Sequence, residues 1–206
     1  MRIGSDRLCG QNVSRETMER LEIYDVLLRK WNESINLVSQ SSLEDLWTRH
    51  IADSVQVFRL AGPIAKWLDI GSGGGLPGAI VAILAMDENP DADFTLIESD
   101  KRKAVFLRTV ARQTGAAFTV ITDRIEKAEP QNANMMSARA VANLSVLLQF
   151  ADRHLDSDGI ALFSKGVSWK NEVDVARQEW NMDIDPVPSL TEPGAVILKI
   201  KGISRV

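Results

Sequence analysis

The sequence predicts an α/β fold, in which a mostly parallel sheet is covered by helices on both faces and is preceded by an N-terminal helical extension. Three observations lead to this prediction. Residues 1–60 show helical spacing, short apolar runs alternate with helical stretches after residue 61, and a glycine-rich segment follows the first of those runs. Strands that alternate with helices are joined by right-handed crossovers and therefore lie mostly parallel.

The helical extension, residues 1–60, is predicted to contain two helices. Within 14–37, apolar side chains recur at three- and four-residue steps, as on one face of an amphipathic helix, and the serine that opens this stretch is a suitable N-cap. These apolar residues are Met18, Leu21, Tyr24, Leu28, Trp31 and Ile35. The second helix is expected over 42–58, because Ser42 and Asp45 resemble a capping box.

The second part of the chain, residues 61–206, is predicted to alternate between strands and helices. The expected strands are 65–70, 93–99, 116–122, 134–139, 159–165 and 194–200, and the expected helices are 77–86, 101–114 and 143–154. Pro77 suits the first turn of a helix, and Gly115 suits a helix C-terminus. This part is therefore expected to be one compact Rossmann-like domain.

The segment Trp67–Gly78, WLDIGSGGGLPG, holds five glycines in twelve residues and is compatible with two ligands. In one frame, Gly73, Gly75 and Gly78 fit the G-x-G-x-x-G pattern of dinucleotide-binding proteins, and Glu98 follows 20 residues later, where an acid binds the ribose. That frame predicts a nicotinamide-dependent oxidoreductase.

The other frame is the pattern Asp69-x-Gly71-x-Gly73-x-Gly75, which begins at the carboxyl end of a predicted strand, as in S-adenosylmethionine (AdoMet) methyltransferases. Electrostatics favours it. Asp69 would repel a pyrophosphate at the loop, and Pro77 lacks one of the N–H donors that such a group needs. AdoMet carries an ammonium and a sulfonium instead, so an acid beside the loop is favourable, and Glu98 can accept hydrogen bonds from both ribose hydroxyls.

Six blocks along the chain resemble one bacterial family. They are KWNESINLVS (30–39), RHIADS (49–54), LDIGSGGGLPG (68–78), TLIESDKRKAVFLR (95–108), ARAVANL (138–144) and SKG (164–166). In their order and spacing they are similar to the RsmG family, also called GidB, and the resemblance extends from about residue 15 to 200. It implies a methyltransferase that moves a methyl group from AdoMet to N7 of a guanine in the decoding-region loop of 16S rRNA, within the small ribosomal subunit.

The resemblance also implies where the cofactor binds. It places Gly71 and Leu76 in the cofactor loop, Ile125 and Glu126 near the adenine, and Arg139 close to both cofactor and target base, with Glu98 at the ribose. Many relatives have alanine and phenylalanine where this chain has Gly74 and Leu76. An AdoMet-binding ribosome-assembly factor without turnover is the alternative function.

Methylation of guanine N7 requires few catalytic groups from the protein. The N7 lone pair needs no deprotonation, so no general base is expected, and Arg139 is the candidate that positions the guanine or the methionine carboxylate. His50 and Asp53 lie three residues apart on one predicted helix face, where they either reach over the cofactor or dock the extension. Lys165 is a candidate for the RNA side.

Composition limits the remaining classes. The chain has 206 residues, 45% hydrophobic, with a net charge of −4, so no general positive field for nucleic acid is expected. Its start lacks a secretory signal and no apolar run reaches the roughly 20 residues of a membrane span, which favours the cytoplasm. One cysteine, Cys9, and two scattered histidines predict neither a disulfide nor a bound metal.

Overall fold

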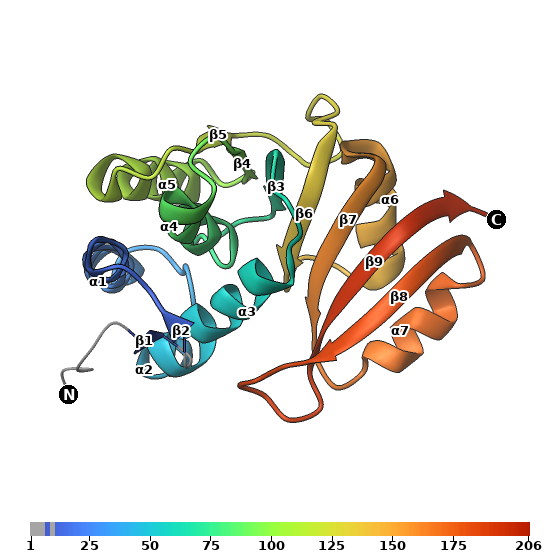
Figure 1. Ribbon diagram of the computed structural model, residues 1–206, viewed down its shortest axis with the longest axis horizontal. Coiled ribbons are helices and arrows are strands. Elements are labelled where there is room, and N and C mark those ends of the chain that lie inside the picture. The colour runs from blue at the N-terminus through green and yellow to red at the C-terminus, as the bar shows by residue number, and fades with distance from the viewer. Residues whose placement is uncertain (1–6, 9–10) are drawn as a thin grey trace.

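The computed structural model describes residues 7–8 and 11–206, so Cys9 lies outside the described residues. Its main sheet consists of β3 (Lys66–Ile70), β4 (Asp93–Ile97), β5 (Thr119–Ile121), β6 (Ala133–Arg139), β7 (Leu155–Lys165), β8 (Trp180–Pro188) and β9 (Val196–Arg205). The order across the sheet is β5-β4-β3-β6-β7-β9-β8 (Figure 1). In this sheet β9 runs opposite to the other six strands, so its pairings with β7 and β8 are antiparallel and the other pairings are parallel. The prediction of a mostly parallel sheet is confirmed.

Helices cover both faces of this sheet. They are α1 (Arg15–Asn32), α2 (Gln40–Glu44), the π-helical turn η1 (Leu46–Ile51), α3 (Ala52–Leu60), α4 (Gly78–Glu88), α5 (Lys101–Thr114), α6 (Leu144–His154) and α7 (Trp169–Ala176). One face carries α3, α4 and α5, with α1 packed on α4 and α5, and the other carries α6 and α7 (Figure 1). Ahead of α1, β1 (Arg7–Leu8) and β2 (Gln11–Asn12) form a short antiparallel pair. Within the described residues, no helix has the length and apolar content needed to cross a bilayer.

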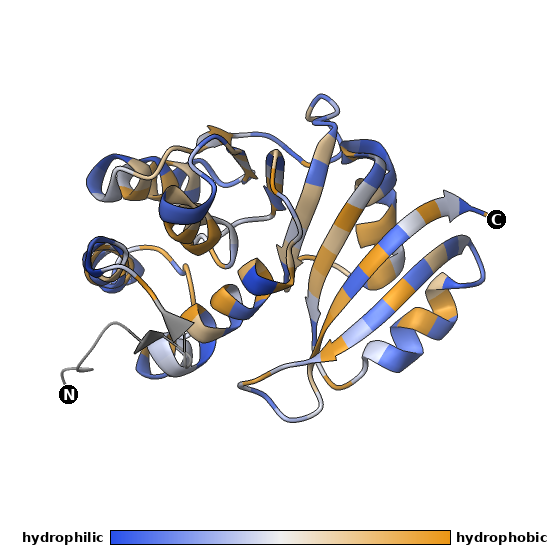
Figure 2. Cartoon of the chain, viewed as in Figure 1, coloured by the Kyte–Doolittle hydropathy of each residue, from blue (hydrophilic) through white to orange (hydrophobic). Residues whose placement is uncertain are grey.

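Two cores result from the alternation of side chains along the strands. Trp67 of β3 packs in the core under α3–α5, and the next residue, Leu68, packs in the core under α6 and α7. In Figure 2, apolar and polar residues alternate most clearly along β8 and β9, at one end of the sheet. Helix α4 is apolar almost all round, and its residues 78–85 are all buried, because it lies between the sheet and the N-terminal helices.

The first helix starts where the sequence predicts and ends earlier. Ser14 caps α1 by accepting a hydrogen bond from the Thr17 N–H at 3.0 Å. At the other end, the side-chain oxygen of Asn32 accepts hydrogen bonds from the backbone N–H groups of Leu37 (2.9 Å) and Val38 (3.0 Å). The prediction of a helix to residue 37 is wrong because Asn32 turns the chain there.

The second predicted helix, 42–58, is also wrong as a single unit. The chain forms α2, η1 and α3 in succession, Ser39 rather than Ser42 caps α2, and Asp45 lies at the C-terminus of α2. The wider turn of η1 buries Leu46, His50 and Ile51 together. Such π-helical turns often occur at functional sites, and this one carries His50 into the interior.

No element is predicted between 166 and 193, yet α7 and β8 lie there. Strand β8 contains Pro186 and the acids Asp183 and Asp185, a composition that favours a loop. It pairs only with β9 at the edge of the sheet, where a proline is tolerated because one side of the strand makes no ladder hydrogen bonds. Edge position therefore explains why sequence patterning missed it.

Candidate active site

The glycine-rich loop follows β3 at the carboxyl edge of the sheet, the lower edge in Figure 1. Gly71 (φ 61°) and Gly73 (φ 52°) both have left-handed backbones. A Cβ at Gly71 would lie 2.7 Å from the side chain of Val141, so the loop after β6 packs directly on it. At Gly73 a Cβ would meet no side chain of the described residues within 4 Å, which leaves space for a ligand beside this backbone.

Leu76 and Pro77 close the loop and lead into α4. Leu76 is buried in the core, so a ligand in this loop would meet its backbone rather than its side chain. Pro77 precedes the first residue of α4 as its N-cap, one position before the expected place, and the Leu76–Pro77 peptide is cis. The hydroxyl of Tyr24 on α1 donates to the Gly74 carbonyl at 2.6 Å, so the extension holds the loop from the side of α1.

Asp69 lies beneath the glycine loop rather than in it. Its carboxylate accepts a hydrogen bond from the Ser137 hydroxyl at 2.5 Å, and that hydroxyl accepts one from the Trp67 indole N–H at 2.9 Å. A Cβ at Gly78 would overlap the Asp69 side chain. Burial raises the pKa of Asp69 to about 6, against the lowering effect of the Ser137 hydrogen bond. Asp69 can therefore act on a ligand only through its charge.

Glu98 follows the end of β4 and binds the glycine loop directly. One carboxylate oxygen accepts from the Gly73 N–H at 2.8 Å and the other from the Asp100 N–H at 2.7 Å. The side chain is buried, with 7% of the residue exposed. An ionised carboxylate has about four acceptor positions, so about two remain for hydroxyl donors of a ligand.

The turn that contains Ile125 and Glu126 lies beyond β5. His154, fully buried at the end of α6, donates its Nε2–H to the Ile125 carbonyl at 2.9 Å and so ties the turn to the second core. Glu126 is exposed. The sequence offered no partner motif for His154, because the contact spans 29 residues.

Arg139 ends β6 and meets His50 of η1. An Nη1–H of Arg139 donates to Nδ1 of His50 at 2.5 Å, since a guanidinium has no acceptor. Burial, followed by the charges of Arg139 and Arg49, lowers the pKa of His50 to about 4, so this imidazole is neutral near pH 7. Burial also lowers the pKa of Arg139. Among the described residues, no carboxylate forms an ion pair with this guanidinium, whose one hydrogen-bond partner there is His50. The guanidinium therefore offers free donors to an anion.

A cavity of about 550 Å³ lies at the carboxyl ends of β6 and β7. The extension contributes Leu37, Val38, Arg49 and Asp53, and the strand ends contribute Arg139 and Lys165. The structure thus brings Arg139, Asp53 and Lys165 to one space, whereas His50 supports Arg139 from behind.

The carboxylates that line this cavity are all engaged. Asp53 accepts hydrogen bonds from the hydroxyls of Thr191 (2.5 Å) and Ser189 (3.3 Å), so it docks the segment before β9 onto α3. Glu192 pairs with Arg49 at 2.5 Å. Docking, one of the two expected roles of the His50–Asp53 face, is thus what Asp53 does.

Glu172 is the third cavity carboxylate, and sequence reasoning missed it. It accepts from Lys165 Nζ at 2.7 Å and from the Leu144 N–H at 2.8 Å. Lys165 also donates to the Ala142 carbonyl at 2.8 Å. The pair therefore fixes the loop 140–143, which carries Val141 onto Gly71. Nothing local in the sequence marks Glu172, because α7 itself was not predicted.

Comparisons with known proteins find one family of similar chains. A family model described as "GidB: rRNA small subunit methyltransferase G" matches residues 17–197. The chain is 58% identical over 195 residues to a "Ribosomal RNA small subunit methyltransferase G" of Ruegeria sp. (strain TM1040), with 95% of each chain covered. It is 57% identical over 195 residues to the protein of the same name from Ruegeria pomeroyi, with 95% of this chain and 96% of that one covered.

Among solved structures, a SAM dependent methyltransferase from Aquifex aeolicus matches with a TM-score of 0.59 at 10% identity. The match covers 85% of this chain and 97% of that chain. At this identity the likeness concerns the fold, and it supports the expected Rossmann-like methyltransferase architecture.

Proposed function

The chain belongs to the rRNA small subunit methyltransferase G family, and we propose that it transfers a methyl group from AdoMet to N7 of a guanine in the decoding-region loop of 16S rRNA. The oxidoreductase interpretation of the glycine pattern is set aside, because the family consists of methyltransferases. We propose the small ribosomal subunit as the partner and the cytoplasm as the location.

The state of the cavity carboxylates is the observation that carries the N7 assignment. Asp53, Glu172 and Glu192 each hold a hydroxyl or a cation of the protein already, and His50 is neutral with its Nδ1 occupied. None of them is placed to remove a proton from an amine or hydroxyl of a substrate. Guanine N7 has a lone pair available at neutral pH, so it is the nucleophile that needs no such base.

The residues present fit AdoMet. Glu98 keeps about two acceptor positions, which suit the two ribose hydroxyls, and the backbone at Gly73 faces open space. Gly71, Gly75 and Leu76 would border the cofactor through their backbone, and Ile125 and Glu126 would approach the adenine. When bound, AdoMet supplies an electrophilic methyl group on a sulfonium.

Arg139 is the proposed positioning residue. Its guanidinium is half-buried, has His50 as its hydrogen-bond partner and faces the cavity. We propose that it holds an anionic group, the methionine carboxylate of the cofactor, or stacks on the target guanine. Asp69 adds negative charge beneath the loop, which favours the cationic cofactor over a pyrophosphate.

Two parts of the chain would share the substrate cavity. We propose that the extension, residues 1–60, supplies one wall with Arg49 and Asp53, and that the Rossmann-like unit, residues 61–206, supplies the other with Arg139 and Lys165. Lys165 would act on the RNA side by fixing loop 140–143 through Ala142.

The test is transfer of radiolabelled methyl from AdoMet to small subunits, or to 16S rRNA, from cells that lack this protein, followed by mapping of the labelled nucleotide. We expect label on N7 of one guanine in the decoding-region loop. Label on another atom or nucleotide would refute the assignment, and AdoMet binding without label would favour an assembly factor without turnover.

A matched pair of variants checks the cofactor site. Glu98→Ala should weaken AdoMet binding about 100-fold or more, since two hydrogen bonds to a charged group are lost at about 1.5–3 kcal/mol each. Glu126→Ala, in the exposed turn, should have a smaller effect. Calorimetric titration with AdoMet measures both.

A further inference from the structure

A second groove lies beside the cavity, between the C-terminal end of α1 and the first turns of α5. It has a volume of about 450 Å³ and is lined by Lys30, Trp31, Ser34, Ile35, Arg102 and Val105. We propose that this groove binds a single-stranded segment of the substrate RNA next to the target nucleotide. The proposal rests on the proposed function, because it takes the RNA as the substrate.

The floor of the groove is apolar and rigid. Trp31 is half-buried and packs on the ring of Phe106, with centroids 5.8 Å apart, so its position is fixed by the core. Ile35 is 8% exposed and Val105, on the other side, is 49% exposed. Unstacked bases of single-stranded RNA bind such surfaces, because every base has an apolar face.

The rim of the groove is cationic. Lys30 and Arg102 both line it, and no carboxylate does. Among the described residues, Lys30 forms no ion pair, and Arg102 approaches Asp100 at 3.3 Å while Asp100 also caps α5. Two cations beside an apolar floor complement a phosphate backbone that carries bases.

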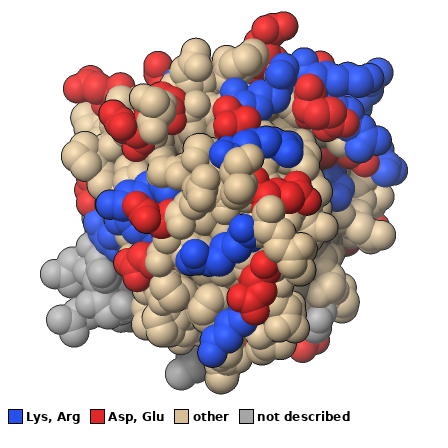
Figure 3. Space-filling model, turned by 90° about the vertical axis from the view of Figure 1, so that its right-hand side faces the viewer, with Lys and Arg blue, Asp and Glu red and all other residues tan. Residues whose placement is uncertain are grey.

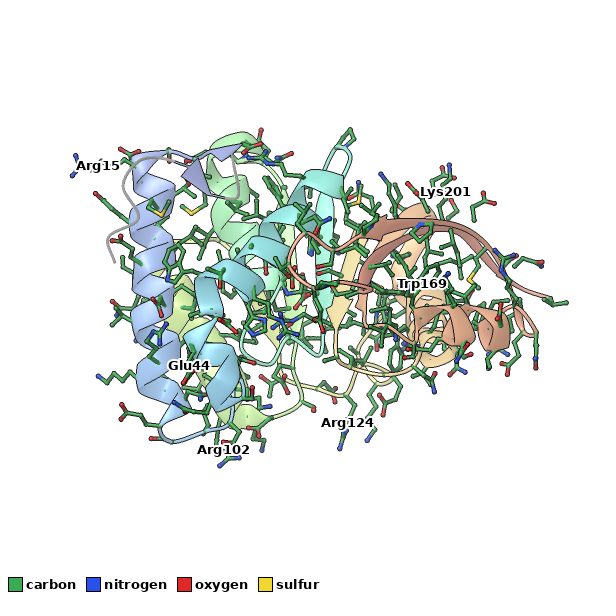
Figure 4. All side chains as sticks on the ribbon, turned by 90° about the horizontal axis from the view of Figure 1, so that it is seen from below. Arg15, Glu44, Arg102, Arg124, Trp169 and Lys201 are labelled. Atoms are coloured by element: carbon green, nitrogen blue, oxygen red, sulfur yellow. The ribbon has the colours of Figure 1, made fainter. Side chains whose placement is uncertain are left out.

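The groove lies at the same edge of the molecule as the cavity. Arg102 is two residues after the α5 N-cap, which follows Glu98 at the carboxyl edge of β4. Figure 4, a view from below, shows Arg102 near the end of α1 that is opposite to Arg15.

One short segment separates the two spaces. Ser34 and Ile35 face the groove, and Leu37 and Val38 line the cavity. Ile35 and Leu37 are two residues apart, so their Cα atoms lie within about 7 Å. An RNA strand whose target guanine enters the cavity would therefore pass over segment 34–38 into the groove.

A third groove provides the control. It has a volume of about 600 Å³ on the β8–β9 side and is lined by Arg177, Lys199 and Lys201 together with Asp183 and Asp185. Figure 3, which views the right-hand side of Figure 1, shows basic and acidic side chains interspersed there. Its two carboxylates offset two of its three cations, so we expect it to contribute less to RNA binding than the groove beside the cavity.

The experiment measures binding of 16S rRNA without AdoMet, by filter retention, over a range of salt concentrations. The double variant Lys30→Ala with Arg102→Ala should lower affinity about tenfold or more and reduce the slope of log K against log salt by about 1.4, since each phosphate contact to a single strand contributes about 0.7. Val105→Glu should also weaken binding. Arg177→Ala with Lys201→Ala, also two cations, should leave affinity and slope unchanged.

Two outcomes would overturn the proposal. An unchanged slope and affinity in the Lys30/Arg102 variant would exclude RNA from the groove. Weaker binding to assembled small subunits with normal binding to free 16S rRNA would assign the groove to a protein instead. Because binding is measured without the cofactor, absence of methyl transfer by the unsubstituted protein would refute the proposed reaction and leave this test intact. Thermal unfolding of each variant checks that it folds.

Discussion

The two halves of the carboxyl edge are built in different ways. On the β3–β4 side, the glycine loop and Glu98 lie within 30 residues of one another, and hydrogen bonds from backbone N–H groups to the Glu98 carboxylate hold them. On the β6–β7 side, Arg139 and Lys165 are held by His50 and Glu172, side chains from an N-terminal turn and from α7. The first half is a local unit, whereas the second exists only when distant segments meet.

The difference indicates a division of labour. The glycine-loop side, where we propose that the cofactor binds, relies on left-handed glycine backbones and one carboxylate, which leave little freedom for substitution. The cavity side relies on charged pairs that fix loops, so its geometry depends on single side chains such as Glu172. Changes on the two sides should therefore have separable effects on stability, cofactor affinity and turnover.

The largest effect is expected at Arg139, where the two halves meet. Arg139→Ala should lower the rate of methyl transfer about 10²–10³-fold, because misplacement of a reacting group and loss of a charged donor each cost on that order. Arg139→Lys should retain part of the rate, since it keeps the charge and loses the planar fork. Single-turnover transfer and AdoMet titration measure this, and unchanged turnover would discard the role.

The next effect concerns His50 and pH. Its folded pKa of about 4 lies below the usual 6.5, so the unfolded chain binds more protons between these values, and stability falls as the pH drops through that window. We expect a loss of about 3 kcal/mol by pH 4 from this group. His50→Asn keeps an acceptor for Arg139 and does not titrate.

Denaturant unfolding of both proteins from pH 7 to pH 4 measures this loss. The comparison with His50→Asn removes the contribution of Asp69, whose raised pKa acts in the opposite direction and adds stability as the pH falls below about 6. Parallel pH profiles for the two proteins would contradict the assignment of a neutral His50.

A smaller loss of folding stability is expected when alanine replaces a left-handed glycine, and two such glycines distinguish the cost of loop packing from that of backbone strain. Gly71→Ala should cost about 2–3 kcal/mol, because φ is left-handed and the new Cβ would overlap Val141. Gly115→Ala, with φ 74° and no neighbouring atom within 4 Å, should cost only about 1 kcal/mol for the backbone alone. Denaturant unfolding measures both, and equal costs would show that Val141 moves away freely.

The smallest effect is expected at Glu172. Glu172→Gln should lower kcat/KM for small subunits about tenfold, since misplacement of loop 140–143 and a buried lysine without its anion cost on the order of 1–3 kcal/mol. AdoMet affinity should fall less than kcat/KM, because loop 140–143 meets the glycine loop through Val141. Asp174→Asn, on the exposed face of the same helix, is the control, and an equal loss in both variants would reject a specific role for Glu172.

Much of the architecture could be predicted because its signals are local. The Ser14 cap, the strand–loop–helix unit from Trp67 to Glu88 and the Glu98 position after β4 depend on residues close in sequence. The short apolar runs also predicted the parallel strands, because strands buried on both faces are continuously apolar. The family resemblance predicted an rRNA methyltransferase, and the family match confirms the family, whereas the N7 position stays a prediction.

Other features depended on contacts that no short window contains. The break of the second helix into α2, η1 and α3 follows from burying His50 against Arg139, 89 residues away. Strand β8 is stabilised by its pairing with β9, which outweighs its proline and acids. Glu172 becomes a cavity residue only because α7 packs beside α6.

The sequence by itself determined the fold class, the glycine loop and the acid that faces it, because backbone conformation and strand patterning are encoded by neighbouring residues. Only the tertiary structure decided that Asp53 docks a distant segment, that His50 is neutral and supports Arg139, and that a basic groove lies beside the cavity. The burial of a side chain and its hydrogen-bond partners depend on segments that are distant in sequence. They are therefore set only when the chain folds and these segments meet.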